Sequence, residues 1–241
     1  MNLADEYYKS LGKITASVYE KNLSTIKELG VIIGESIGNG GVLHTFGSGH
    51  SSIIAQEIIH RAGGLVPVSA IIDPTGGWVE TIPGYGTKLV QRHHYTYELR
   101  KDEIVIVISN SGKNPVPLEV ALECKKLGLT LVAVTSVEMS QQAQTDPLIR
   151  KRLYEISNFV LDNCGVVGDA AIEIPGQPDK IGPTSTMTGT LLLNLLAMEA
   201  MQYLVENNIP LPIYRSANLP GARDFNEKIS IKYKNRLSRP L

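Results

Sequence analysis

The sequence has few cysteines and no long apolar run, and both shortages exclude classes of protein. Only two cysteines occur among its 241 residues, Cys124 and Cys164, and they lie far apart without a metal-binding spacing. We therefore expect free thiols in a reducing cytoplasm, and no metal site or disulfide framework. No window of about 18 apolar residues is free of polar or charged breaks, so no membrane partner is predicted. A charged segment follows Met1, so no signal peptide is expected.

An excess of positive charge is also missing. The chain has 23 Lys and Arg against 24 Asp and Glu, which gives a formal net charge of −1. A protein that coats nucleic acid needs a strong basic excess, so no nucleic-acid partner is predicted. The hydrophobic fraction of 43% is enough for a sizeable core.

Continuous apolar runs alternate with amphipathic stretches along most of the chain. Strands that are buried on both faces of a parallel sheet have such runs, and strand–helix alternation implies right-handed crossovers. The sequence therefore predicts an α/β fold, a three-layer αβα sandwich on a doubly wound parallel sheet. The expected strands are 42–46, 65–72, 104–108, 131–135, 158–162 and 170–174, and the expected helices are 51–62, 115–127, 187–206 and one between 136 and 156.

Both ends of the chain are expected to lie outside the main domain. Apolar residues recur at helical spacing from Leu3 to Ile37 and predict a long N-terminal helix, with a break near Gly30. The basic C-terminal tail is expected to be ordered only by a partner chain. The final helix is apolar on nearly every face, which favours an oligomer. The expected division is 1–37, an N-terminal helical segment; 38–210, the main domain; and 211–241, the tail.

The run HTFGSGHSS joins the first expected strand to a helix. Gly47 and Gly49 allow close backbone approach to a ligand, while Ser48 and Ser51 offer hydroxyl groups on either side of His50. The helix that follows has unpaired N–H groups at its start, which favour an anion.

Two other interpretations of this run stay open. It could be a plain tight turn in which Ser51 caps the helix. It could also be a dinucleotide loop, with Asp73 at the end of the second strand as the ribose-binding acid. Ser52 stands where the third glycine of the dinucleotide fingerprint belongs.

Two further turns of similar composition follow. ISNSGKNP places Ser109, Asn110 and Ser111 after a buried strand, and Asn114 before Pro115, where a helix cap is favoured over a ligand contact. PTSTMTG places Thr184, Ser185 and Thr186 before the last helix, and any one of them could be its cap. The first two of these turns, at the carboxyl edge of one parallel sheet, would suit an anionic, polyhydroxylated ligand such as a sugar phosphate.

These turns resemble the sugar isomerase (SIS) domain family, whose Gly-Ser-rich loop and S-x-S-G-x-T loop bind phosphosugars. The second motif reads Ser109-Asn110-Ser111-Gly112-Lys113-Asn114 here, with Asn in place of Thr. The chain is similar to the phosphoheptose isomerase-like branch and to the UPF0309 family. No cofactor is expected. The resemblance implies a flavodoxin-like fold and a homodimer or homotetramer with sites between subunits. The substrate-binding residues it implies are Gly47, Ser48, Gly49, His50, Ser51, Ser109, Asn110, Ser111, Asn114, Thr184, Ser185 and Thr186.

An isomerase also needs a base and a proton donor near the sugar. Glu57 and His60 lie on the expected helix after the first loop, nearly one turn apart, and they are the catalytic candidates. A solvated or interface pair is the alternative. Glu80, His93 and His94 could replace them from the Gly- and Pro-rich excursion 73–98. Neighbouring His93 and His94 point apart, so no metal site is predicted there.

The leading hypothesis is a cytoplasmic protein that binds a phosphosugar, with isomerisation as its reaction. A non-catalytic sugar-phosphate sensor, an etherase-type lyase acting on an amino-sugar phosphate and a dinucleotide oxidoreductase are the alternatives. About 40 residues precede the first strand, too few for the helix-turn-helix domain that such sensors usually carry.

Overall fold

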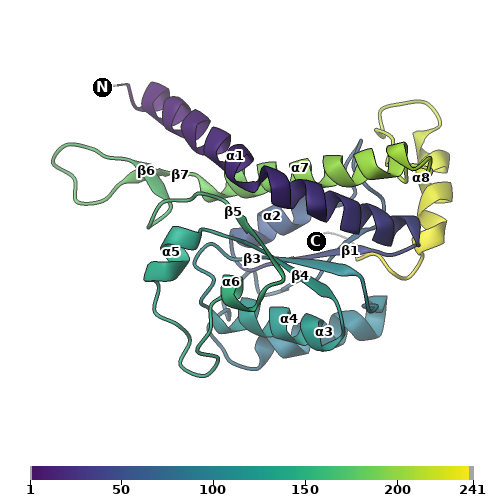
Figure 1. Cartoon of the computed structure of the whole chain (residues 1–241), viewed down its shortest axis with the longest axis horizontal. Coiled ribbons are helices and arrows are strands. Elements are labelled where there is room, and N and C mark those ends of the chain that lie inside the picture. The colour runs from purple at the N-terminus through teal and green to yellow at the C-terminus, as the bar shows by residue number, and fades with distance from the viewer. Residues whose placement is uncertain (1, 239–241) are drawn as a thin grey trace.

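The computed structural model describes residues 2–238 and contains one parallel sheet of five strands. The strand order is β2-β1-β3-β4-β5, and helices cover both faces, which confirms the predicted three-layer αβα sandwich (Figure 1). The chain reverses its direction of progress across the sheet between β1 and β3, which creates a topological switch point. The strands are β1 Leu43–Gly47, β2 Val68–Ala70, β3 Ile104–Ile108, β4 Thr130–Thr135 and β5 Phe159–Asp162.

Two apolar cores lie on opposite faces of this sheet. In β3, Ile104 and Ile106 belong to one core, whereas Val105 and Val107 belong to the other. Successive side chains of a strand point to opposite faces, so a strand buried on both sides must be apolar throughout. On one face lie α1 Leu3–Gly38, α2 Ser51–Glu57 and α7 Ser185–Glu206; on the other lie α3 Tyr85–Tyr97, α4 Pro115–Lys126 and α6 Leu153–Ile156.

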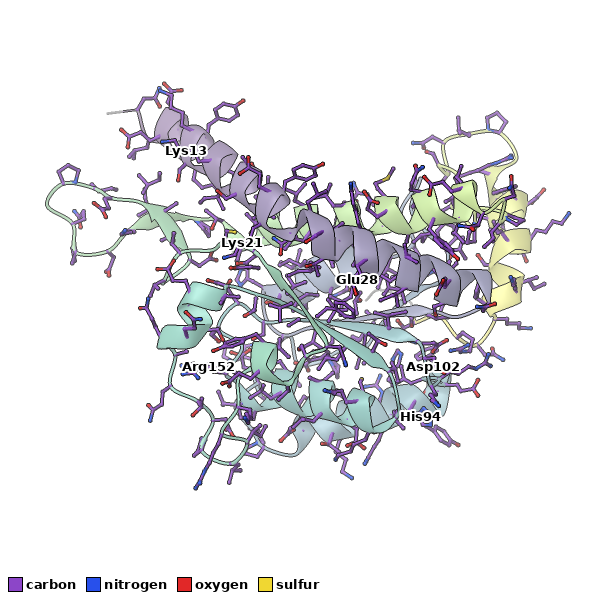
Figure 2. All side chains as sticks on the ribbon, viewed as in Figure 1. Lys13, Lys21, Glu28, His94, Asp102 and Arg152 are labelled. Carbon is purple, nitrogen blue, oxygen red and sulfur yellow. The ribbon has the colours of Figure 1, made fainter. Side chains whose placement is uncertain are left out.

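The N-terminal helix α1 is continuous, so the predicted break near Gly30 is wrong. A Cβ atom on Gly30 would lie 2.5 Å from Cβ of Glu199, because α1 and α7 pack closely there. The glycine therefore allows two helices to approach each other. Lys21, labelled in Figure 2, donates to Asp162 of β5 at 2.6 Å and ties α1 to the sheet edge.

The helix α2 ends at Glu57, earlier than the predicted end at residue 62. The Thr45 hydroxyl donates to the carbonyl of Ala55 at 2.7 Å, while the Ile59 N–H bonds to Gln56 three residues back. The chain then takes a positive φ of 51° at His60, which ends any helix. A strand residue thus competes for the last carbonyls of the helix.

The strand β2 covers only three of the residues predicted for it. Pro67 has no N–H for the sheet, and the Val66 N–H donates to the carbonyl of Pro212 at 2.7 Å. Leu65 pairs with Ile213 in an antiparallel bridge. The first part of the predicted strand therefore pairs with the C-terminal tail.

Three other segments differ from their predictions. The sixth predicted strand, β6 Ala170–Ile172, pairs only with β7 Ile181–Pro183, in an antiparallel hairpin separate from the main sheet. The region 136–156 holds two short helices, α6 and α5 Val137–Gln142, joined by irregular chain. The excursion 73–98 contains α3. No helix among the described residues is long and apolar enough to cross a membrane.

The C-terminal tail packs on its own chain, so the prediction that only a partner chain orders it is wrong. It forms α8 Ala222–Ser230 and the 3₁₀ turn Ile231–Tyr233 beside the sheet (Figure 1). The Ser238 hydroxyl donates to the carbonyl of Ala70 at 2.7 Å, which covers the edge of β2. The division at residues 37 and 210 stays a prediction.

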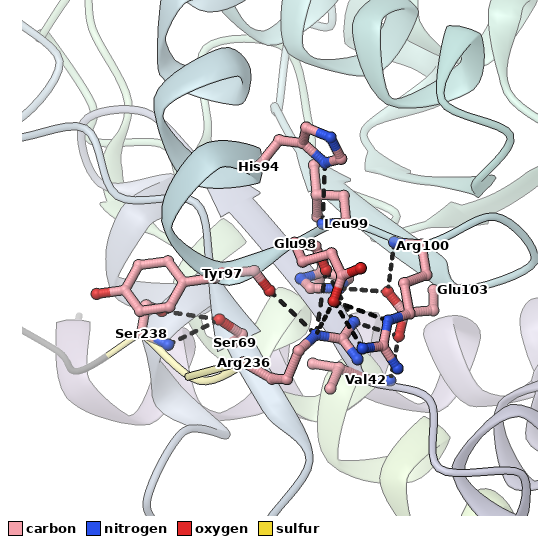
Figure 3. Close-up of polar contacts among 11 residues, drawn as sticks. Val42, Ser69, His94, Tyr97, Glu98, Leu99, Arg100, Glu103, Arg236 and Ser238 are labelled. Atoms are coloured by element: carbon pink, nitrogen blue, oxygen red, sulfur yellow. Dashed lines mark hydrogen bonds and ion pairs between the residues drawn. The ribbon is translucent and has the colours of Figure 1, made fainter. Parts of the chain in front are cut away.

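A buried ionic network connects this tail to the end of α3 and to Glu103 (Figure 3). The Arg236 guanidinium donates to Glu103 at 2.6 Å and to the carbonyls of Tyr97 and Glu98 at the end of α3. His44 Nε2 lies 3.0 Å from the same Glu103 carboxylate. Burial would raise the pKa of Glu103, but hydrogen bonds from His44, a backbone N–H and Arg236 hold it at about 2.

The fold is expected to lose stability as the pH falls from 7 to 4. Burial lowers the pKa of His93 from 6.5 to about 3, so between these values only the unfolded chain takes up the proton. Because the pKa of Glu103 is lower in the folded than in the unfolded chain, its carboxylate stabilises the fold. This contribution is complete above pH 4.5 and is lost as the pH falls further. The urea midpoint should decrease from pH 7 to 5 and again from 5 to 4.

His93→Asn separates the two groups. This variant should lose part of the decrease over the whole range from pH 7 to 4, because the contribution of His93 extends down to its folded-state pKa of about 3. It should keep the part that comes from His44, whose pKa burial also lowers, and the part below pH 4.5 that comes from Glu103. A wild-type midpoint that stays constant from pH 7 to 5 would contradict the role of His93.

Candidate functional site

The loops after β1 and β3 lie side by side at the switch point, because the two strands pair in register from Leu43–Ile104 to Gly47–Ile108. A cavity of about 580 Å³ opens there, within the usual size range of small-molecule sites. The predicted substrate-binding residues that line it are Ser48, Gly49, His50, Ser51, Ser109, Asn110, Ser111, Asn114, Ser185 and Thr186.

Close backbone packing shapes the first loop. A Cβ atom on Gly47 would lie 2.2 Å from the carbonyl oxygen of Ser51, so only glycine allows this tight turn into α2. Gly77 packs against it, since a Cβ atom there would lie 2.4 Å from the Gly49 nitrogen. The Ser48 hydroxyl is buried beside the cavity, and none of the described residues bonds to it.

The second loop presents hydroxyl groups to the same cavity. The buried Ser109 Oγ accepts a hydrogen bond from the Gly112 N–H at 3.2 Å, which folds the turn. Gly112 has a φ of 59° and faces Ser140 Oγ, at 2.9 Å from its ideal Cβ position. Asn110 accepts from the Asn163 amide at 2.9 Å and so fixes its own side chain.

The third turn is organised by an acid that the sequence did not indicate. Both Asp169 oxygens are occupied: one accepts from the N–H groups of Thr184 and Ser185, and the other from the Ser185 hydroxyl at 2.6 Å. Asp169 therefore caps α7, which neither Thr184 nor its neighbours do with their own side chains. No local signal could have found it, because 15 residues separate Asp169 from Thr184.

Glu80 enters the cavity from the loop between β2 and α3. Its Oε1 accepts a hydrogen bond from the Asn114 amide at 2.8 Å. Asn114 occupies the N-cap position of α4, but its side chain makes no capping bond, contrary to the favoured prediction. The sequence predicted Glu80 only as a substitute for Glu57 and His60, and no motif pointed to Met139 of α5, which also lines the cavity.

Other predicted residues do not line this cavity. Glu57 is the last residue of α2 and forms an ion pair with Arg61. His60 packs edge-on against the ring of Tyr214, with ring centroids 5.3 Å apart. Thr184 is buried, and Gly47 is the buried last residue of β1. The catalytic roles of Glu57 and His60 remain predictions. Since neither residue lines this cavity, such a role would need a site formed with a neighbouring subunit.

The two histidines of α3 also lie elsewhere. His93 is buried against His44, with ring centroids 5.7 Å apart, and His94 accepts from the Leu99 N–H at 3.1 Å. No group of three or more His, Cys, Asp or Glu among residues 2–238 could hold a metal ion. Both cysteines are free, and burial raises the pKa of each thiol.

Known proteins share both the sequence and the fold of this chain. The SIS domain family matches residues 6–136, which include the first two turns. A UPF0309 protein of Listeria monocytogenes is 36% identical over 231 residues, which cover 96% of this chain and 97% of that protein. The chain belongs to the SIS domain family. A UPF0309 protein of Caldanaerobacter subterraneus is also 36% identical, over 241 residues, with 97% of this chain and 96% of that protein covered.

Solved structures resemble this SIS chain at low sequence identity. A phosphoheptose isomerase from Francisella tularensis has a TM-score of 0.59 at 15% identity and covers 83% of this chain and 96% of its own. The Vibrio vulnificus NanR protein complexed with ManNAc-6P has a TM-score of 0.53 at 16% identity, with 86% and 65% covered. These likenesses agree with the observed SIS fold.

Proposed function

We propose that this SIS protein binds a sugar phosphate at the switch point and isomerises it between aldose and ketose. The observation that carries the proposal is the composition of the cavity. Serine hydroxyls from two loops, Ser48, Ser109 and Ser111, line the cavity together with the carboxylate of Glu80. Hydroxyl groups suit a phosphate and the sugar hydroxyls, and a carboxylate can move a proton between adjacent carbons.

The phosphate end of the ligand is expected to lie on the second loop. Ser109 and Ser111 lie in the loop between the end of β3 at Ile108 and the start of α4 at Pro115, where the helix dipole favours an anion. No Lys or Arg is among the described residues that line the cavity. Within this chain, the hydroxyl, amide and imidazole side chains of the cavity and the N–H groups of its loops are therefore the available donors to a phosphate.

The comparisons support the same class of ligand. One structure of the same fold is a phosphoheptose isomerase, and another is a protein complexed with ManNAc-6P, an amino-sugar phosphate. A sugar-phosphate sensor and an etherase-type lyase would use the same cavity, and the experiment below distinguishes them from an isomerase.

The test combines ligand binding with isotope exchange. Trp78, the only tryptophan, is 92% exposed two residues before Glu80, so a change in its fluorescence is one readout of a ligand that alters this loop. A panel of aldose, ketose and amino-sugar phosphates is screened in this way and by thermal shift. An isomerase substrate should exchange solvent deuterium into a carbon-bound position. Binding without exchange would favour a sensor. Release of lactate from a sugar lactyl ether would favour a lyase. The absence of any binding would overturn the proposal.

We further propose that the protein forms at least a dimer. Met187, Met198 and Val205 are more than half exposed and lie on one side of α7, at helical positions 11 and 7 residues apart. Such an apolar stripe is expected to be covered by a second copy. Light scattering at micromolar concentration should give at least twice the monomer mass, and Met198→Lys should lower it. A monomer mass for the wild type would contradict this prediction.

A further inference from the structure

The geometry points to Glu80 as the proton-transfer residue of this site and to Asn114 as the residue that positions it, an inference that rests on the proposed isomerase function. Glu80 is one of two carboxylates that line the cavity, with Asp169. The two carboxylates differ in the number of hydrogen bonds that they accept, and this number indicates which of them is available for proton transfer.

Asp169 is fully occupied by the fold. Its two oxygens accept four hydrogen bonds from the backbone N–H groups and hydroxyls of Thr184 and Ser185. Protonation of Asp169 would remove the cap of the long helix α7. The carboxylate of Glu80, in contrast, accepts only one bond from the described residues, from Asn114 to Oε1. Its second oxygen can therefore exchange a proton with a ligand.

The backbone holds Glu80 in place from both directions. The Glu80 N–H donates to the carbonyl of Gly77 at 3.1 Å, and its own carbonyl accepts from the Val116 N–H of α4 at 3.2 Å. Gly77 is packed against Gly49 of the first loop. Glu80 is thus connected to the loops after β1 and β3, which holds its carboxylate at a defined place in the cavity.

Hydrogen bonds to two carboxylates, Asp73 and Glu119, order the rest of this loop. The Asp73 carboxylate accepts from the N–H groups of Thr75 and Gly77 and from the Tyr85 hydroxyl at 3.0 Å. On the other side, Glu119 of α4 accepts from the N–H groups at the start of α3. The Gly- and Pro-rich excursion of the sequence is therefore an ordered support for one carboxylate.

The reaction step balances without a co-reactant other than water. Glu80 takes the proton from the carbon next to the carbonyl, and the electron pair of that C–H bond forms the double bond of an enediol. The carbonyl oxygen takes a proton from solvent or from His50, whose imidazole lines the same cavity. Return of the proton from Glu80 to the neighbouring carbon, with loss of the other hydroxyl proton, gives the isomer.

Glu80→Gln tests the assignment, since it keeps the shape and the ability to accept a bond from Asn114. It should retain ligand binding in the Trp78 fluorescence assay and reduce deuterium exchange by about 100- to 10,000-fold. Glu28→Gln, on the exposed surface of α1 (Figure 2), is the matched control and should exchange like the wild type. Exchange by Glu80→Gln at the wild-type rate would overturn the role of Glu80 and leave the proposed function intact. A wild type that binds sugar phosphates and exchanges none would overturn both.

Asn114→Asp tests the positioning role. A second carboxylate beside Glu80 would disfavour its charged form, so the acidic limb of the pH–rate profile should move to higher pH. The other titratable groups of the cavity, His50 and Asp169, are unchanged in this variant. A lower rate with the pH profile of the wild type would show that Asn114 only supports the structure.

Discussion

Glu103→Ala is expected to destabilise the fold by about 3–5 kcal/mol, the usual effect of removing one partner of a buried ion pair. The Glu103 carboxylate accepts from Arg236 at 2.6 Å, from the Val42 N–H at 3.0 Å and from the Arg100 N–H at 2.9 Å. The substitution would leave the Arg236 charge, whose side chain is 8% exposed, without its carboxylate. Urea denaturation at pH 7 measures the loss directly.

The matched control is Glu98→Ala. Glu98 also lies near Arg236, at 4.0 Å, but its side chain is 56% exposed and pairs with Arg100 in solvent. Water screens such an exposed pair, so this variant should change stability little. A double variant, Glu103→Gln with Arg236→Met, removes both charges of the pair. It should be more stable than Glu103→Ala, because no unpaired charge of this pair is left buried. Equal losses for Glu103→Ala and Glu98→Ala would contradict the network.

Replacing Ser109 and Ser111 together with Ala is expected to weaken sugar-phosphate binding by about 3–6 kcal/mol, because hydrogen bonds to a charged group contribute about 1.5–3 kcal/mol each. Both hydroxyls line the cavity beside the start of α4. Titration calorimetry with a ligand found in the screen gives the affinity. Circular dichroism verifies the fold, since Ser109 also accepts from the Gly112 N–H.

Ser157→Ala is the control for this pair. Ser157 follows α6 and donates to the carbonyl of Leu153, and it does not line the cavity. Its affinity should equal that of the wild type. If the double variant also binds like the wild type with its fold intact, the second loop is not the phosphate site.

The sequence by itself determined the layers of the fold and the edge where the site lies. Strands such as Ile104–Ile108 are apolar at every position, because each of their two faces meets a separate core. The turns 47–51 and 109–114 follow such strands directly, and the carboxyl ends of parallel strands meet at one edge. These features are local, so composition and order along the chain are enough to predict them.

Only the tertiary structure decided which carboxylates face the cavity and where several elements end. Glu57 had a place on the predicted helix, but a hydroxyl from β1 takes a carbonyl of α2 and the helix stops at this residue. Glu80 and Asp169 are held at the cavity by hydrogen bonds to residues 34 and 15 positions away, Asn114 and Thr184. The tail likewise pairs with the first part of the predicted second strand, through the bridge between Leu65 and Ile213. Such pairings depend on chain topology and on competition for backbone groups, and no local pattern records either of them.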